Sequence, residues 1–303
     1  MYRVGMNTSP AVWFPCLRVA LGLMLWVMAF GAQASLAAGS AQALRELHGK
    51  LGDKLAHSPL KRPIVLDSAE TDGGLQGDVY VVVDHSLDDV RRALEQSSQW
   101  CEMLLLHINN RRCRVAGDTL TLSVVPRYDK PIDQAFELSF THRTVSSGRD
   151  YLQIELAAQE GPMGTSRYRV LVEGIPLGEQ QSFLHFAYSY DHNMVARLAT
   201  MAYLATFGSH KVGFTVVDKK PSGDPEYIRG LRGLVERNAM RYFLALEAYL
   251  DGLPVPAGNR VDKRLRRWFE ASERYPAQLH EIDLATYLDV KREDRQRDAA
   301  PTR

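Results

Sequence analysis

The side chains best suited to chemistry are one histidine and two tyrosines that stand two residues from an apolar side chain on predicted strands. The three pairs are Phe140 with His142, Tyr168 with Val170, and Phe186 with Tyr188. Because residues two apart share one face of a strand, each polar ring lies in an apolar wall. Such rings can line a pocket, where a ligand or a trapped water bonds to their polar atoms. The other interpretation is a filled core, in which they bond to one another or to the backbone.

Two further groups of polar residues favour catalysis less. His185, His192 and His210 cluster around the last of these strands, but no two have the His-x-x-x-His spacing of a helical zinc site. Charged residues of the same strands alternate onto the opposite face; they are Glu155, Arg169 and Glu173. An acid–base pair that faces a substrate is therefore not predicted. The sequence indicates no metal and no cofactor, and it favours a binding protein over an enzyme.

These strands belong to a predicted antiparallel meander. Four segments alternate apolar and polar residues with short turns between them; they are Phe136–Arg143, Tyr151–Ala158, Ser166–Ile175 and Ser182–Tyr190. A period of two is typical of strands that bury one face. The glycine-bearing turn Gly161–Gly164 is interpreted as a hairpin or as a gate over the mouth of a cavity. The aromatic side chains of the last segment predict that the buried face covers another element.

Helices and further strands flank the meander. Before it the sequence predicts a helix, Ala41–Ala56, a strand, Gly77–Val83, two helices, Leu87–Gln96 and Trp100–Leu106, and two strands, Cys113–Ala116 and Thr119–Val125. After it come a helix, Asn193–Phe207, a last strand, Lys211–Val217, and a long helix, Pro225–Leu250. Leu231, Val235 and Tyr242 fall on the apolar stripe of the long helix. The predicted fold class is α+β.

This order of elements resembles the helix-grip fold of the START/polyketide-cyclase-like (SRPBCC) superfamily. The resemblance spans Gly77 to Leu250, and short stretches such as Gly77-Asp78-Val79-Tyr80, Glu173-Gly174-Ile175-Pro176-Leu177 and Lys211-Val212-Gly213-Phe214-Thr215 are similar to a secreted bacterial branch. It implies a curved antiparallel sheet that grips the C-terminal helix around an apolar cavity. It also implies an aromatic or lipid-sized ligand. The residues expected to bind it are Phe140, His142, Tyr168, Val170, Phe186, Tyr188, Leu231, Val235 and Tyr242.

The N-terminus has the pattern of a secretory signal peptide. Arg3 and Arg18 precede an uncharged apolar run, Val19–Gly31, and the small residues Ala32-Gln33-Ala34 follow it. We expect cleavage after Ala34 and a periplasmic protein. The alternative is an uncleaved membrane anchor, although the run is shorter than the roughly 20 apolar residues that span a bilayer.

Export would place two cysteines in an oxidising compartment. Cys16 lies in the signal peptide, so Cys101 and Cys113 remain, with a turn at Asn109-Asn110 between them. An even pair in this context predicts a disulfide. The alternative, a redox-active pair, lacks the Cys-x-x-Cys spacing.

The predicted organisation is a signal peptide (1–34), an N-terminal helix with an extended lead-in (35–74), the helix-grip domain (75–251) and a charged helical tail (252–303). The tail is expected to be disordered from Arg292 onward. Within it, Lys263–Phe269 combines cations with aromatic residues, which is typical of a helix that docks on a membrane or an envelope protein, or of one solvated helix face. The net charge of +1 argues against a nucleic-acid partner.

We therefore predict a secreted protein that holds a lipid or another apolar small molecule between sheet and helix, with lipid transfer as a related role. The first alternative is a structural or interaction protein of the cell envelope with a filled core. The second is an enzyme that acts on an apolar substrate.

Overall fold

The computed structural model describes residues 32–71, 73–206 and 208–299, with side chains from Ala41 onward. The chain divides into two units, Met1–Ser40 and Ala41–Arg303, and of the first only the start of helix α1 (Ala32–Ala56) is described. The apolar run Val19–Gly31 of the predicted signal peptide lies outside the described residues, so export stays a prediction. Within the described ranges no helix is both long and apolar enough to cross a membrane.

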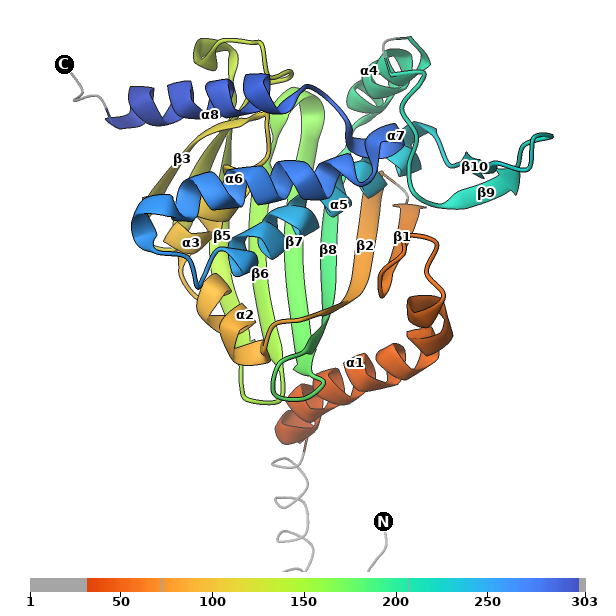
Figure 1. The fold of residues 1–303 in the computed structure, drawn as a ribbon, viewed down its shortest axis with the longest axis vertical. Helices are drawn as coiled ribbons and strands as arrows, with labels where there is room; N and C mark the ends of the chain where they lie inside the picture. Colours follow the sequence, from red (N-terminus) through yellow and green to blue (C-terminus); the bar gives the residue numbers. More distant parts are fainter. Residues whose placement is uncertain (1–31, 72, 207, 300–303) are drawn as a thin grey trace, which may run out of the picture. The chain divides into compact units, whose positions relative to one another are not determined.

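The second unit is built on an antiparallel sheet of eight strands in the order β1-β2-β8-β7-β6-β5-β4-β3 (Figure 1). Its strands are β1 (Ile64–Thr71), β2 (Gly74–Val83), β3 (Asn110–Ala116), β4 (Thr119–Val124), β5 (Phe136–Ser147), β6 (Leu152–Glu160), β7 (Thr165–Pro176) and β8 (Ser182–His192). Consecutive strands from β3 to β8 pair with one another, which confirms the predicted meander. Strand β2 pairs with β8 on one side and with β1 on the other, which completes the sheet.

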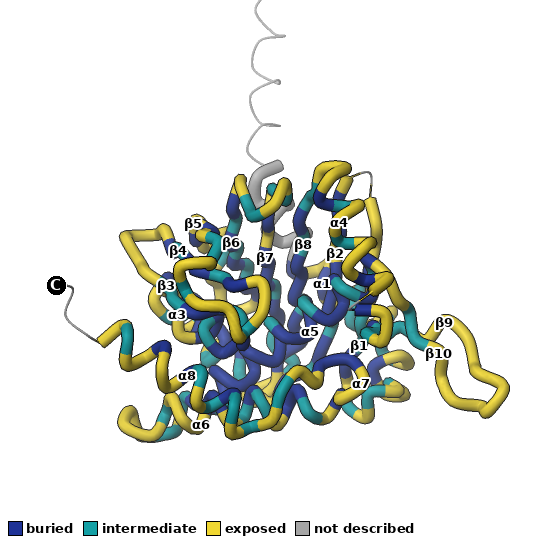
Figure 2. The backbone as a smooth tube through the Cα atoms, turned by 90° about the horizontal axis from the view of Figure 1, so that it is seen from above, coloured by how far each residue is buried: buried dark blue, intermediate teal, exposed yellow. Residues whose placement is uncertain are grey.

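One face of the sheet carries the main core. On β5, Leu138, Phe140 and His142 are buried and the residues between them are exposed, as the alternation predicts. Helices α2 (Leu87–Leu94), α3 (Ser97–Leu104) and α5 (Gly230–Asp251) pack on this face. Figure 2 shows the buried positions gathered along the strands and α5. The predicted α+β helix-grip architecture is therefore confirmed.

Close contact between β2 and the long helix depends on a glycine. A Cβ atom at Gly77 would lie 3.0 Å from the main-chain oxygen of Val235 and 3.0 Å from the Cβ of Ala239. Real side chains rarely come so close, so only glycine lets α5 lie directly on this strand. Val235 and Ala239 are fully buried at the contact.

The long helix begins later than predicted, and the predicted last strand is wrong. Val216–Lys219 (β9) pairs with Pro225–Tyr227 (β10) in a separate two-stranded sheet, and α5 starts only at Gly230. A buried carboxylate on α5 holds the segment that precedes β9. Glu236 accepts hydrogen bonds from the main-chain nitrogens of Phe214 and Thr215, at 2.6 and 3.0 Å, and from the hydroxyl of Thr215 at 2.7 Å. This segment is therefore bonded to the helix instead of to the main sheet.

The opposite face of the sheet is partly covered by α1. From Ala41 onward this helix buries Ala41, Leu44 and Leu55 against Tyr151 and Phe183 in a second, smaller core. The apolar side of the predicted amphipathic helix is therefore buried, but against the outer face of the sheet.

Three helices follow α5: α6 (Ala257–Glu273), α7 (Pro276–Leu279) and α8 (Leu284–Ala299). Helix α6 packs on α5, and α8 contacts both α6 and β3. The predicted disorder from Arg292 is wrong, because α8 continues to Ala299 and Asp294 is buried in an ion pair with Arg111.

The predicted disulfide joins Cys101 of α3 to Cys113 of β3. The two residues are 12 positions apart, and closing a loop of this length stabilises a protein by roughly 3 kcal/mol in the chain-entropy model. The bridge fastens α3 to the edge of the sheet.

Candidate functional site

The structure brings together much of the predicted ligand site, but the space inside is small. Phe140, Tyr168, Val170, Tyr188 and Tyr242 line a cavity of about 20 Å³ between the sheet and α5. That volume holds about one water molecule. A lipid could enter only if several of these side chains moved.

Aromatic rings fill the rest of this interior. Tyr168 stacks on Tyr190 with 5.2 Å between ring centroids, and Tyr188 lies 5.4 Å from Tyr242. Burial raises the pKa of Tyr188 well above its ordinary value and the pKa of Tyr242 to about 12. Since neither phenol ionises near neutral pH, the cluster is suited to packing and hydrogen bonding and not to proton transfer.

The remaining predicted site residues are buried in the same core but do not line this cavity. They are His142, Phe186, Leu231 and Val235. The Nε2 atom of His142 lies 3.0 Å from the main-chain oxygen of Leu94. This ring is therefore bonded to the backbone, as the filled-core interpretation requires.

On the outer face of the sheet, His185 bridges two carboxylates. Its Nε2 lies 2.8 Å from Asp78 and its Nδ1 lies 2.9 Å from Glu173, while Tyr80 stacks on the ring. Burial alone would lower the pKa of His185, but the hydrogen bonds to Asp78 and Glu173 raise it to about 9. The group is a paired imidazolium at neutral pH. No cluster of metal-binding side chains is found within the described ranges.

A larger apolar hollow lies between α6, α8 and the segment that links α3 to β3. Its volume is about 270 Å³, and its apolar wall consists of Leu105, Leu106, Val261 and Leu265. We call it the C-terminal groove. None of these residues was predicted to bind a ligand.

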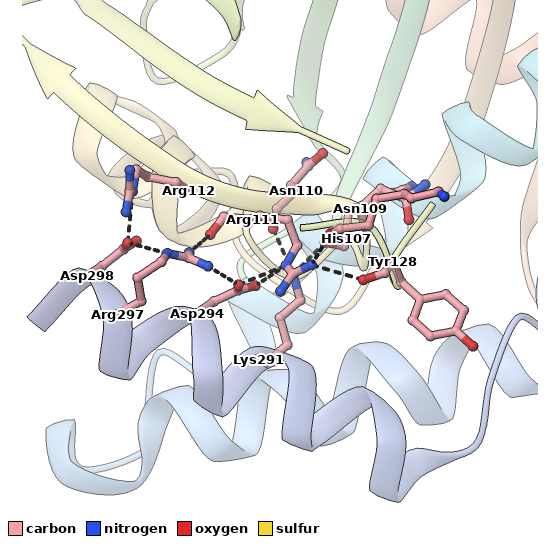
Figure 3. Close-up of polar contacts among 11 residues, drawn as sticks. His107, Asn109, Asn110, Arg111, Arg112, Tyr128, Lys291, Asp294, Arg297 and Asp298 are labelled. Carbon is pink, nitrogen blue, oxygen red and sulfur yellow. Dashed lines mark hydrogen bonds and ion pairs between the residues drawn. The ribbon is translucent and has the colours of Figure 1, made fainter. Parts of the chain in front are cut away.

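One wall of the groove, α8, is fastened by polar contacts (Figure 3). Arg111 donates from Nε to both carboxylate oxygens of Asp294, at 2.8 and 2.9 Å. Lys291 donates from Nζ to the main-chain oxygens of His107 and Asn110, at 2.7 and 2.8 Å. The side chains of Arg111, Lys291 and Asp294 lie between α8 and the start of β3, so the wall is positioned by charges and carbonyl groups.

Two side chains at this junction have shifted pKa values. Burial lowers the pKa of Lys291 to about 7, against the attraction of Asp294. Burial also lowers the pKa of His107 well below its ordinary value, with Arg241 and Lys291 acting in the same direction. The groove therefore borders a lysine that changes charge near neutral pH.

The opposite wall, α6, contains the predicted docking segment Lys263–Phe269. Leu265 and Trp268 are buried, and the indole of Trp268 donates to the main-chain oxygen of Arg241 at 3.1 Å. Arg264 is also buried, above the ring of Tyr249 and paired with Glu102 at 2.6 Å. Because α6 packs these side chains on α5 and α8, Trp268 is not available to insert into a membrane. Phe269, the other aromatic residue of the segment, is half-buried against Tyr287, so membrane docking of this segment stays a hypothesis.

Exposed apolar side chains gather instead on α4 (Met194–Ala205). They are Met194, Val195, Leu198 and Met201, and Met163 is exposed on the turn between β6 and β7. The main-chain nitrogen of Asn193 donates to the oxygen of Gly164 at 3.0 Å, so this turn lies beside the start of α4.

No protein-family model matches the sequence, and no curated protein matches it either. Solved structures give similarities of fold. Norcoclaurine synthase from Thalictrum flavum is 16% identical, with 48% of this chain and 80% of that chain covered and a TM-score of 0.31. A START superfamily protein from Mycobacterium smegmatis is 15% identical, with 47% and 91% covered and a TM-score of 0.30.

The Zhui aromatase/cyclase from a Streptomyces species is 11% identical, with 64% of this chain and 98% of that chain covered and a TM-score of 0.38. At such low identity, nothing about the reactions of these proteins carries over to this chain. By the order of its strands and the place of α5, the chain has the helix-grip fold that its sequence predicts.

Proposed function

We propose that this protein binds a small, largely apolar molecule in the C-terminal groove. The observation that carries the proposal is the predominantly apolar wall of the groove, which encloses about 270 Å³ next to buried polar groups. Ligand sites are typically hollows of this composition. The interior between sheet and α5, with about 20 Å³, has no comparable room.

The groove sets limits on the ligand. A protein cavity of about 150 Å³ is enough to bind benzene, so the groove has room for a substituted ring or for one bent acyl chain of medium length. Removing about 200 Å² of apolar surface from water contributes roughly 5 kcal/mol, from which the entropy cost of association is subtracted. A lipid with two full-length chains does not fit.

We also propose that the protein works in the periplasm. The apolar run Val19–Gly31 and the Cys101–Cys113 disulfide support export to an oxidising compartment. A carrier or sensor of apolar molecules would be useful there, since such molecules must cross an aqueous space between two membranes.

Filling the groove should abolish binding. Val261 is 40% exposed on α6 and lines the groove, so Val261→Trp adds bulk there without disturbing the core. We expect the affinity for decanol, measured by isothermal titration calorimetry on the purified protein, to fall at least tenfold. The matched control is Val115→Trp, because Val115 is 42% exposed on β3 and lies outside the groove.

The control should bind as the unmodified protein does. If Val261→Trp leaves decanol binding unchanged, the ligand lies elsewhere, and the interior beneath Tyr168 becomes the site to test. If the unmodified protein binds neither decanol nor decanoate, the proposed function is wrong.

A second candidate function is that of an envelope interaction protein, and the exposed apolar side chains of α4 favour it. Sedimentation velocity should then reveal concentration-dependent self-association that Leu198→Glu abolishes. Val145→Glu is the matched control, because Val145 is an exposed valine on β5. A monomer at all concentrations would remove self-association as the role of α4.

A further inference from the structure

We infer that the ligand of the C-terminal groove carries a negatively charged group and that Arg295 binds this group at the mouth of the groove. The inference rests on the proposed function and specifies the class of ligand: a single-chain or single-ring amphipathic anion, such as a medium-chain carboxylate. It follows from the charges around the groove.

Basic side chains outnumber acidic ones in the lining of the groove by four to three, although Lys291, whose pKa is about 7, is only partly charged at neutral pH. The cationic side chains that line it are Arg111, Arg264, Lys291 and Arg295, and the anionic ones are Glu102, Asp294 and Asp298. Two more arginines reach the same carboxylates from outside the lining. Arg112 donates to Asp298 at 2.8 Å, and Arg297 donates to Asp294 at 2.9 Å.

Three of the four lining cations are already bound. Arg111 pairs with Asp294, Arg264 pairs with Glu102, and Lys291 donates to two main-chain oxygens. Arg295 is exposed on α8 and makes no hydrogen bond or ion pair with any residue in the ranges that the structure describes. Of the other lining cations, Arg264 keeps one buried nitrogen, Nε, without a partner, but its guanidinium is already paired with Glu102 through Nη1. Among the described residues, Arg295 is therefore the lining cation that has no counter-ion.

The geometry of a guanidinium suits this role. Its planar fork of N–H groups bonds both oxygens of a carboxylate at once, and the same fork accepts a phosphate or a sulfate. With an apolar body against Leu105 and Leu265, a head group could meet Arg295, which lines the same groove and is exposed to solvent. The anionic residues of the groove do not repel such a group strongly, because each of them is paired with at least one arginine.

The test compares decanoate with decanol, which share the chain and differ in charge. We expect decanoate to bind the unmodified protein roughly five- to tenfold more tightly in low salt, as a charge-assisted hydrogen bond provides. In about 0.5 M NaCl the preference should shrink, since a charge at the mouth is screened.

Arg295→Gln should lower the affinity for decanoate to that for decanol and leave decanol binding unchanged, and Arg295→Lys should restore part of the preference. Arg292→Gln is the matched control, because Arg292 is an exposed arginine on the same helix, is paired with Asp289 and lies outside the groove. We expect this control to keep the full preference.

Each failure has a separate meaning. If the unmodified protein binds decanoate and decanol equally, the inference is wrong and the proposed function stands. If the preference survives Arg295→Gln, another cation receives the anion and the role assigned to Arg295 is wrong. If neither compound binds, the proposed function itself fails.

Discussion

Replacing Asp294 by alanine is expected to lower the free energy of unfolding by about 3 to 5 kcal/mol, because it leaves the guanidinium of Arg111 buried without its counter-ion. The two side chains are 7% and 8% exposed, so water cannot replace the lost partner. Helix α8 should also detach from β3, and decanoate binding should weaken with it. Urea unfolding followed by circular dichroism measures the first effect, and calorimetric titration measures the second.

Asp289→Ala is the matched control for this prediction. Asp289 lies on the same helix and pairs with Arg292 at 2.5 Å, but the two side chains are 62% and 56% exposed. Exposed pairs contribute about 0 to 1 kcal/mol, so this variant should unfold almost as the unmodified protein does. Equal decreases in the free energy of unfolding for the two variants would show that the buried Arg111–Asp294 pair stabilises the protein no more than an exposed pair does.

The second large effect is a pH dependence that His185 brings to stability. The folded protein holds the proton of His185 up to about pH 9, whereas the unfolded chain releases it near pH 6.5. Between these values the folded state binds more protons, so stability falls as the pH rises. The contribution of His185 to the free energy of unfolding is roughly 3 kcal/mol. It is fully present below about pH 6.5 and is lost above about pH 9.

His185→Gln isolates this contribution. Lys291 acts in the opposite direction between about pH 7 and 10.5, because its folded form has released a proton that the unfolded chain keeps. Lys291 is present in both the unmodified protein and the variant, so its contribution cancels when their free energies of unfolding are subtracted. We expect a difference of about 3 kcal/mol at pH 6 that declines towards zero at pH 9.5.

His280→Gln serves as the comparison, since His280 pairs with Glu273 but its side chain is 53% exposed. Its removal should change the free energy of unfolding little, because water screens the pair. A difference for His185→Gln that is constant across the pH range would mean that the ring acts by packing alone.

Local sequence patterns predicted the sheet well. Alternation placed Leu138, Phe140 and His142 on the buried face of one strand, and each strand of the meander followed from its own residues. The start of the long helix depended instead on a contact between distant parts of the chain. Pro225 and Glu226 have the composition of a first helical turn, yet they pair with Lys219 and Asp218 of β9 and are extended. Glu236 of α5 bonds the neighbouring segment at Thr215.

The candidate site was harder to predict for the same reason. The tyrosines were placed correctly on the inner face, but whether rings fill a cavity depends on how they pack across strands. On α8, Tyr287, Lys291 and Asp294 recur at spacings of four and three, which puts them on one helix face. That spacing was visible in the sequence. A polar face of this kind normally indicates solvent, and only the position of Arg111 reveals that it is buried.

The polar contacts between α8 and β3 also affect the solubility of the protein. Strand β3 ends the sheet, so its outer main-chain groups have no neighbouring strand to bond. Lys291 donates to the main-chain oxygen of Asn110, and Arg297 donates to that of Arg111. These side chains therefore cover the first residues of the exposed strand edge. Edges left open recruit strands from other molecules and start aggregates. Helix α8 therefore protects this strand edge against aggregation and also forms one wall of the C-terminal groove. A chain that ends before Leu284 should lose both the protection and the groove.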